Sequence, residues 1–227
     1  MEREAVRGCV RSARHELRLR QRAVVDADVV ILGVRVVVGV VRRMTEPAAV
    51  IEAHVLELPS DGGGVDELVD ERARRGIVQR GGKYLFVYSR KYGDCKFPGG
   101  GMETGESQPD TLIREVREES GLCIIPTTIC PFGYVHRIQK GNPEDVFIQD
   151  NYYYLCAAEQ EVVPQALDDY EDEERFSLEW VFPSQVLYTN RYKNHGLKQG
   201  NFRLDTMLER ECRVVELLIA EKVIADQ

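Results

Sequence analysis

The sequence predicts an α/β fold in which a mixed sheet lies between helices, and three observations support this prediction. Short apolar runs separated by turn residues recur from residue 49 to residue 182, which is typical of strands. A helix with start and stop signals is indicated over residues 107–121. An amphipathic pattern over residues 202–225 predicts a second, longer helix. Helices covering both faces of one sheet form an α/β/α sandwich.

The first strands are predicted from apolar runs and from the turn between them. Residues 49–58 indicate a strand. Two further runs, residues 73–80 and 83–89, flank Gly81 and Gly82, which is a strong hairpin signal.

The helix over residues 107–121 has recognisable boundaries. Ser107 followed by Asp110 resembles a capping box, and Pro109 lies in the first turn, where its missing N–H costs nothing. Gly121 supplies the stop, because a helix end often needs the left-handed conformation. The apolar residues of this helix, which we expect to pack on the sheet, are Leu112, Ile113 and Val116.

Strands are also predicted beyond this helix, with a polar loop over residues 139–145. They span residues 123–129, 133–138, 146–158 and 177–182, the last with Trp180 in the core. Pro183 then opens a short helix. Tyr153 should face away from Tyr152 and Tyr154, because side chains alternate along a strand. For these rings we favour core packing over contact with a base.

Three carboxylates and a glycine-rich loop form the main candidate site. Glu115, Glu118 and Glu119 occupy positions i, i+3 and i+4 and therefore share one side of the helix. Arg114 and Arg117 could offset their repulsion, so an exposed acidic face without a ligand is physically sound. The loop just before the helix changes that balance, because its glycines let the backbone approach a ligand closely. They are Gly99, Gly100, Gly101 and Gly105.

Residues 100–122 resemble the Nudix box, whose pattern is Gly-x5-Glu-x7-Arg-Glu-U-x-Glu-Glu-x-Gly-U with U a bulky aliphatic residue. The sequence matches every defined position, at Gly100, Glu106, Arg114, Glu115, Val116, Glu118, Glu119, Gly121 and Leu122. The chain is thereby identified as similar to the Nudix hydrolases, with a looser resemblance over about residues 50–183. The resemblance implies the same α/β/α sandwich.

The resemblance also implies an activity and a metal. Members of the family cleave a pyrophosphate bond in nucleoside diphosphates linked to another group, with Mg²⁺ or Mn²⁺. By position, the metal ligands would be Glu115, Glu118, Glu119 and the backbone carbonyl of Gly99. Arg114 would pair with Glu106 and hold the loop in shape.

The residue that accepts the proton from the attacking water stays open between two sources. It is either one of the box glutamates or an acid from the run at residues 168–174, expected to be a substrate-facing loop. Glu171 and Glu173 are the favoured candidates in that run, against the alternative of a solvated charged loop. Arg90 and Lys96 flank the entry to the glycines and are candidates for phosphate contacts, or else ordinary surface cations.

Charge is unevenly distributed along the 227 residues, whose net charge is −8. Residues 1–43 hold ten arginines and five acids, so the remainder carries −13. An acidic body argues against a partner that is a nucleic-acid polymer. A small nucleotide is still compatible, because a metal ion can mediate the attraction.

The first 43 residues are rich in arginine and valine and differ from the rest. Their apolar run, residues 29–41, is too short and too polar to span a membrane. Neither a signal peptide nor a transit peptide fits well. We expect residues 1–43 to be a non-native or disordered extension, with Met44 as the natural start, and residues 44–227 to be one domain. Intact mass of the native protein tests this, and a mass beginning at Met1 would contradict it.

Six cysteines show no CxxC pair and no zinc-ligand spacing. Free cysteines of this kind are typical of a reduced, cytoplasmic setting. No motif places any of the four histidines beside a cysteine, so a cysteine nucleophile has little support.

The leading prediction is a metal-dependent hydrolase, and its main alternative is a non-catalytic Nudix domain that senses a nucleotide. Complete box glutamates favour the enzyme. An isoprenoid-diphosphate isomerase would need a cysteine and extra metal-binding histidines that the pattern does not show. Simple subfamily markers are absent around Ile138, so a nucleoside triphosphate and a nucleotide sugar both stay open. The final helix could pack on its own core or on a second copy, which would give a homodimer.

Overall fold

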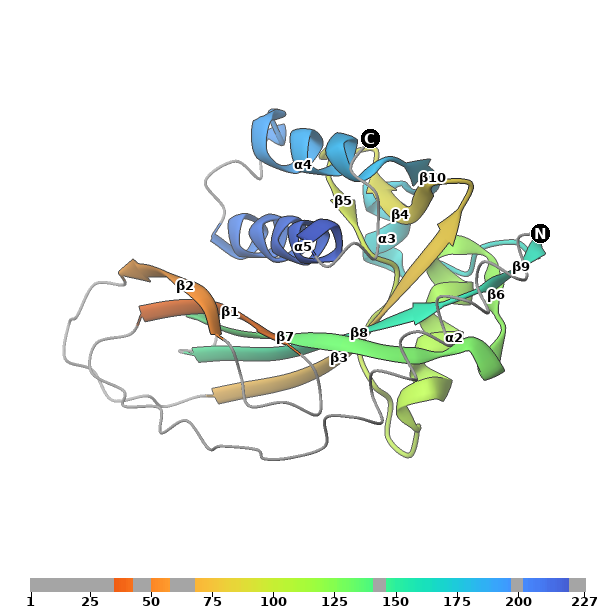
Figure 1. Ribbon diagram of the computed structural model, residues 1–227, viewed down its shortest axis with the longest axis horizontal. Helices are drawn as coiled ribbons and strands as arrows, with labels where there is room; N and C mark the ends of the chain where they lie inside the picture. The colour runs from red at the N-terminus through yellow and green to blue at the C-terminus, as the bar shows by residue number, and fades with distance from the viewer. Residues whose placement is uncertain (1–34, 43–49, 58–67, 141–145, 197–201, 221–227) are drawn as a thin grey trace.

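The computed structural model describes residues 35–42, 50–57, 68–140, 146–196 and 202–220. Within these ranges, most of the chain forms one large mixed sheet with helices on both faces (Figure 1). No helix in the described ranges is long and apolar enough to cross a bilayer. Residues 1–34, which belong to the predicted extension, lie outside the described residues.

The large sheet has a fixed strand order. It runs β10 (Phe176–Val181), β4 (Lys83–Ser89), β3 (Leu68–Arg80), β8 (Val146–Cys156), β7 (Cys130–Lys140), β1 (Arg35–Arg42) and β2 (Val50–Glu57). A short strand, β5 (Cys95–Lys96), pairs with β4. The β3–β8 pair is parallel and the other named pairs of this sheet are antiparallel, which makes it mixed.

Two hydrophobic clusters on opposite faces of the sheet confirm the predicted α/β/α sandwich. On one face, Leu112 and Val116 of α2 (Gln108–Ser120) pack against Val78 and Leu85. The other face carries α4 (Pro183–Tyr192) and α5 (Phe202–Ala220). There Val186, Val214 and Leu218 pack with Ile77, Phe86, Phe97 and Tyr153. Each helix buries one apolar stripe, and the sheet buries both of its faces.

The hairpin and the helix that bring the site together follow their sequence signals. Gly81 and Gly82 have φ values of 57° and 77°, which suits the two central positions of a type I′ turn between β3 and β4. Ser107 caps α2 and accepts a hydrogen bond from the Asp110 backbone N–H. Gly121 ends α2 in the left-handed conformation, with φ 72°.

Several other predicted elements are confirmed. Strands appear within residues 49–58, 133–138 and 177–182, and α4 begins at Pro183 as expected. Tyr153 lies in the cluster under α5, whereas Tyr152 and Tyr154 pack in the cluster under α2, so the predicted alternation is confirmed.

Three predicted elements differ from the structure. Residues 123–129 were expected to form one strand, but β6 (Leu122–Ile124) stops before a 3₁₀ turn at Pro126–Thr128, because proline cannot donate to a ladder. The long strand 146–158 is instead β8 followed by β9 (Ala158–Val162), which pairs with β6 in a second sheet. The acidic run is a short helix, α3 (Asp169–Glu174), rather than a loop.

Part of the predicted extension contributes a strand. Residues 35–42 form β1, which pairs with β7 on one side and β2 on the other. The last residues of the predicted helix at 202–225 lie outside the described residues, and α5 is described as far as Ala220.

Candidate functional site

The glycine loop lies against β3 through backbone hydrogen bonds. Gly76 N–H donates to the Pro98 carbonyl at 2.8 Å, and Arg74 N–H donates to the Gly100 carbonyl at 2.9 Å. Gly99 has φ 135°, and a Cβ there would lie 1.9 Å from the Arg74 carbonyl oxygen. Only glycine fits this position, because the conformation and the close approach both exclude a side chain.

Arg114 holds the loop to α2. Its Nε and Nη2 donate to the two carboxylate oxygens of Glu106 at 2.6 and 2.9 Å, and Nη2 also donates to the Gly101 carbonyl at 3.0 Å. These hydrogen bonds lower the pKa of Glu106 to about 2 and raise the pKa of Arg114. The predicted pairing of these two residues is therefore present in the structure.

The carboxylates of Glu115 and Glu118 converge on one nitrogen. Arg114 Nη1 donates to Glu115 Oε1 at 2.8 Å and to Glu118 Oε2 at 3.0 Å. A Cβ at Gly100 would lie 2.2 Å from Glu115 Oε2, so the glycine leaves space for this carboxylate. Burial is the main cause that raises the pKa of Glu115, and Arg114 opposes it.

Glu119 is the buried member of the trio, with 2% of its surface exposed. Its Oε2 accepts a hydrogen bond from the Gly99 N–H at 2.6 Å, and Oε1 lies 3.8 Å from Lys96 Nζ. Burial raises the pKa of Glu119 to about 7, and Lys96 opposes that rise. Burial likewise lowers the pKa of Lys96, whose ammonium lies 3.7 Å from the centroid of the Phe176 ring.

The donor chemistry of these residues fits a hard divalent cation. Carboxylate and backbone carbonyl oxygens are the ligands that Mg²⁺ prefers. The Arg114 nitrogen already marks a position between Glu115 and Glu118 where positive charge is held. Over the described ranges, however, no three His, Cys, Asp or Glu side chains are grouped closely enough to hold a metal ion. Glu119 instead contacts Gly99 N–H and Lys96, and Arg75 Nη1 donates to the Gly99 carbonyl.

The two acidic-run candidates occupy different environments. Glu171 is buried, accepts hydrogen bonds from the Tyr170 hydroxyl and the Asp168 N–H, and interacts electrostatically with Glu119. Glu173 is 71% exposed and pairs with Lys91. The structure therefore brings Glu171 toward the carboxylates and leaves Glu173 at the surface.

The two predicted phosphate contacts also separate. Lys96 lies at the site, beside Glu119. Arg90 is exposed and forms an ion pair with Glu179 at 3.0 Å. No described contact joins Arg90 to the box glutamates.

Arg75 is a site residue that sequence reasoning missed. Its Nη1 donates to the carbonyls of Phe97 and Gly99, directly before the box. The available signal was strand alternation, which places Arg75 on the same face of β3 as Ile77 and opposite to Arg74.

Comparisons with known proteins agree with the sequence motif. The family model for the NUDIX domain matches residues 70–200. An uncharacterized Nudix hydrolase of Bacillus subtilis, YvcI, is 42% identical over 55 residues, which is 24% of this chain and 35% of that protein. The chain thus matches about a third of the length of this relative.

Solved structures with a similar fold include two Nudix-type proteins. A NUDIX hydrolase from Nitrosomonas europaea has a TM-score of 0.43 and 17% identity, covering 60% of this chain and 87% of that one. The E. coli ORF135 protein has a TM-score of 0.43 and 19% identity, covering 72% of this chain and all of that one.

Proposed function

This chain belongs to the NUDIX domain family, and from that premise we propose that it is a hydrolase of a phosphoanhydride bond in a small nucleotide derivative. The substrate would be a nucleoside diphosphate linked to another group or a nucleoside triphosphate. The observation that supports this best is the convergence of Glu115 and Glu118 on one positive group, with Glu119 anchored to Gly99 beside them.

We propose Glu115, Glu118, Glu119 and the Gly99 carbonyl as the residues that would hold Mg²⁺ or Mn²⁺. Such an ion, when bound, neutralises a diphosphate and lowers the pKa of a bound water. Arg114 would then leave its contacts with Glu115 and Glu118 and keep its pair with Glu106. That pair uses different nitrogens, Nε and Nη2, so the loop stays held.

The chain's own groups divide the remaining work. Lys96 is buried beside Glu119 and would face the phosphate oxygens as a positive charge. A carboxylate must accept the proton of the attacking water. The candidates are the box glutamates and Glu171, whose buried position near Glu119 suits the role better than the exposed position of Glu173.

Turnover of a nucleotide panel with Mg²⁺ tests this function. We expect the wild type to release phosphate, pyrophosphate or a mononucleotide from at least one substrate, read by ³¹P NMR. Glu118→Gln and Glu119→Gln should lower the rate at least about 100-fold, since a metal contributes several kcal/mol to such reactions. Glu216→Gln on α5, where Glu216 pairs with Arg191, is the matched control and should keep the rate.

The alternative, a non-catalytic nucleotide sensor, predicts a different result. Wild type and both site variants would then show the same background on every substrate, although a nucleotide still bound. That outcome would exclude the hydrolase.

A further inference from the structure

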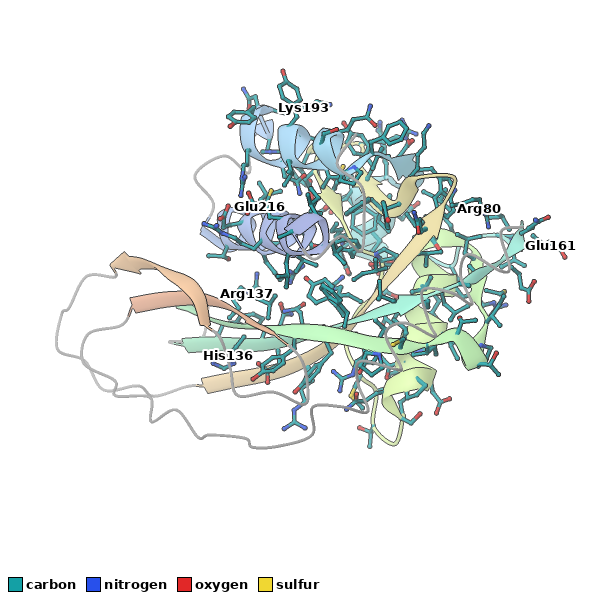
Figure 2. All side chains as sticks on the ribbon, in the orientation of Figure 1. Arg80, His136, Arg137, Glu161, Lys193 and Glu216 are labelled. Atoms are coloured by element: carbon teal, nitrogen blue, oxygen red, sulfur yellow. The ribbon has the colours of Figure 1, made fainter. Side chains whose placement is uncertain are left out.

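Three arginine side chains from different elements lie together between the sheet and α5. Arg75 comes from β3, Arg137 from β7 and Arg210 from α5, and all three are buried, at 8%, 6% and 1% exposure. Figure 2 shows Arg137 on the side of the sheet that α5 covers. Arg137 also lies within 3.5 Å of the Thr206 hydroxyl on that helix. Buried arginines are costly unless each is paired.

Neutral amides, rather than carboxylates, join these arginines. Gln149 Oε1 accepts from Arg137 Nη2 at 2.7 Å and from Arg210 Nη1 at 3.1 Å. Asn151 Oδ1 accepts from the same Arg210 nitrogen at 2.8 Å and from Arg75 Nε at 3.4 Å. We call this set the arginine cluster: Arg75, Arg137, Arg210, Gln149, Asn151 and Glu211.

The arginine cluster has more positive than negative charge. Glu211, which pairs with Arg210, is its one carboxylate among the six residues just defined. Glu119 also acts on Arg75 electrostatically, but it lies beside Lys96. Burial, with Arg210 and Arg75 adding to it, lowers the pKa of Arg137 to about 9.

The cluster also lacks hydrogen-bond acceptors. Arg137 Nε is buried and has no hydrogen-bond partner in the part of the chain that the structure describes. The single oxygen of Gln149 serves three donors, because Asn151 Nδ2 also donates to it, at 3.0 Å. A group that brings several acceptor oxygens and negative charge would satisfy both deficits.

The cluster is continuous with the candidate active site. Arg75 contacts Asn151 through Nε and the Gly99 carbonyl through Nη1, so one side chain spans both. The members with the most remaining exposure are Arg75, Arg137 and Gln149. A ligand held by the cluster would therefore reach the loop that precedes the box glutamates.

We propose that the arginine cluster binds a phosphate group of the nucleotide substrate, an inference that rests on the proposed function. Phosphate supplies the acceptor oxygens and charge that the cluster lacks, and guanidinium groups match it in bidentate geometry. A neutral sugar supplies neither. The cluster therefore favours a nucleoside triphosphate, or another substrate with an additional phosphate, over a nucleotide linked to a neutral sugar.

Metal-free binding of inorganic tripolyphosphate tests this inference. Isothermal titration in excess chelator at constant ionic strength removes divalent cations, so the box carboxylates repel the probe and do not bind it. We expect wild type to bind tripolyphosphate and Arg137→Gln to bind it at least about tenfold more weakly. Arg213→Gln is the matched control, because Arg213 lies on the same helix as Arg210 but pairs with Glu209 and Glu216 instead.

The expected control result is an unchanged affinity in Arg213→Gln. If Arg137→Gln does not fold, Arg137→Lys carries the test, with a several-fold weaker affinity expected because lysine keeps the charge but loses the fork of donors. Absence of binding by wild type, unchanged affinity in a folded Arg137 variant, or an equal loss in Arg213→Gln would each overturn the proposal. None of these results depends on hydrolysis, so failure of the proposed function would appear separately, in the turnover assay.

Thermal unfolding distinguishes a ligand site from a purely structural cluster. A ligand that binds only the folded state raises Tm. Tripolyphosphate should therefore raise the Tm of wild type and of Arg213→Gln, and raise that of Arg137→Gln much less. An equal rise in all three proteins would show that the cluster only joins α5 to the sheet.

Discussion

Arg114 grips Glu106 with two nitrogens, at 2.6 and 2.9 Å, and so ties the loop after the glycines to the helix that carries the box glutamates. Glu106 also accepts hydrogen bonds from the Glu103 N–H and the Thr111 hydroxyl. Because one carboxylate satisfies four donors, its loss leaves several groups without a partner at once.

Glu106→Gln should therefore destabilise the fold by about 1–3 kcal/mol, as is typical for a hydrogen bond to a charged group. Urea unfolding measures this free energy. Glu103→Gln is the matched control, because Glu103 is 71% exposed and its carboxylate lies 3.9 Å from Arg114, and it should change stability by less than about 0.5 kcal/mol. Equal effects of the two substitutions would contradict the anchoring role of Glu106.

The same pair predicts how stability depends on pH. The pKa of Glu106 is lowered from 4.5 to about 2 in the folded state. Its contribution is therefore complete above the unfolded pKa and is lost as pH falls toward the folded one. The unfolding free-energy difference between wild type and Glu106→Gln should stay constant from pH 7 to about pH 5 and shrink at lower pH. A difference that grows on acidification would contradict the assigned direction.

Gly100 and Gly101 offer a matched pair for the space around Glu115. A Cβ at Gly100 would meet the Glu115 carboxylate at 2.2 Å, whereas a Cβ at Gly101 meets nothing within 4 Å. We expect Gly100→Ala to displace Glu115 and lower the hydrolysis rate at least about tenfold. The expected cost in stability is below about 1 kcal/mol, because the displaced group is the far end of a flexible side chain. Gly101→Ala should keep the rate, and an equal loss in both variants would refute this reading of the loop.

Gly76 permits the close packing of α2 on β3. Its Cβ position lies 2.9 Å from Val116 Cγ2, a core atom with little freedom to move. Gly76→Ala should destabilise the fold by about 1–3 kcal/mol through overpacking, measured by chemical denaturation. Val116→Ala in the same chain should recover part of that loss by making space. Additive losses in the double variant would show that the two positions do not compete.

Features set by neighbouring residues could be predicted from the sequence. Ser107 and Gly121 bound α2 through their own backbone groups, and the pair Gly81–Gly82 defines its hairpin locally. The box glutamates likewise share one side of a helix because of their spacing alone.

Features that depend on distant partners could not be predicted. Arg75 contacts Gly99 and Asn151 only because β3 lies parallel to β8, and no local pattern encodes that pairing. Similarly, Glu171 and Glu173 are two residues apart and look alike in sequence. Only the packing of α3 buries the first and exposes the second.

Mn²⁺ binding, followed by electron paramagnetic resonance, tests the central claim that the box glutamates form a cation site. Wild type should bind Mn²⁺, and Glu118→Gln should bind it at least about tenfold more weakly, because a charged oxygen ligand is lost. Glu216→Gln should match wild type. Equal Mn²⁺ affinity in wild type and Glu118→Gln would contradict the account.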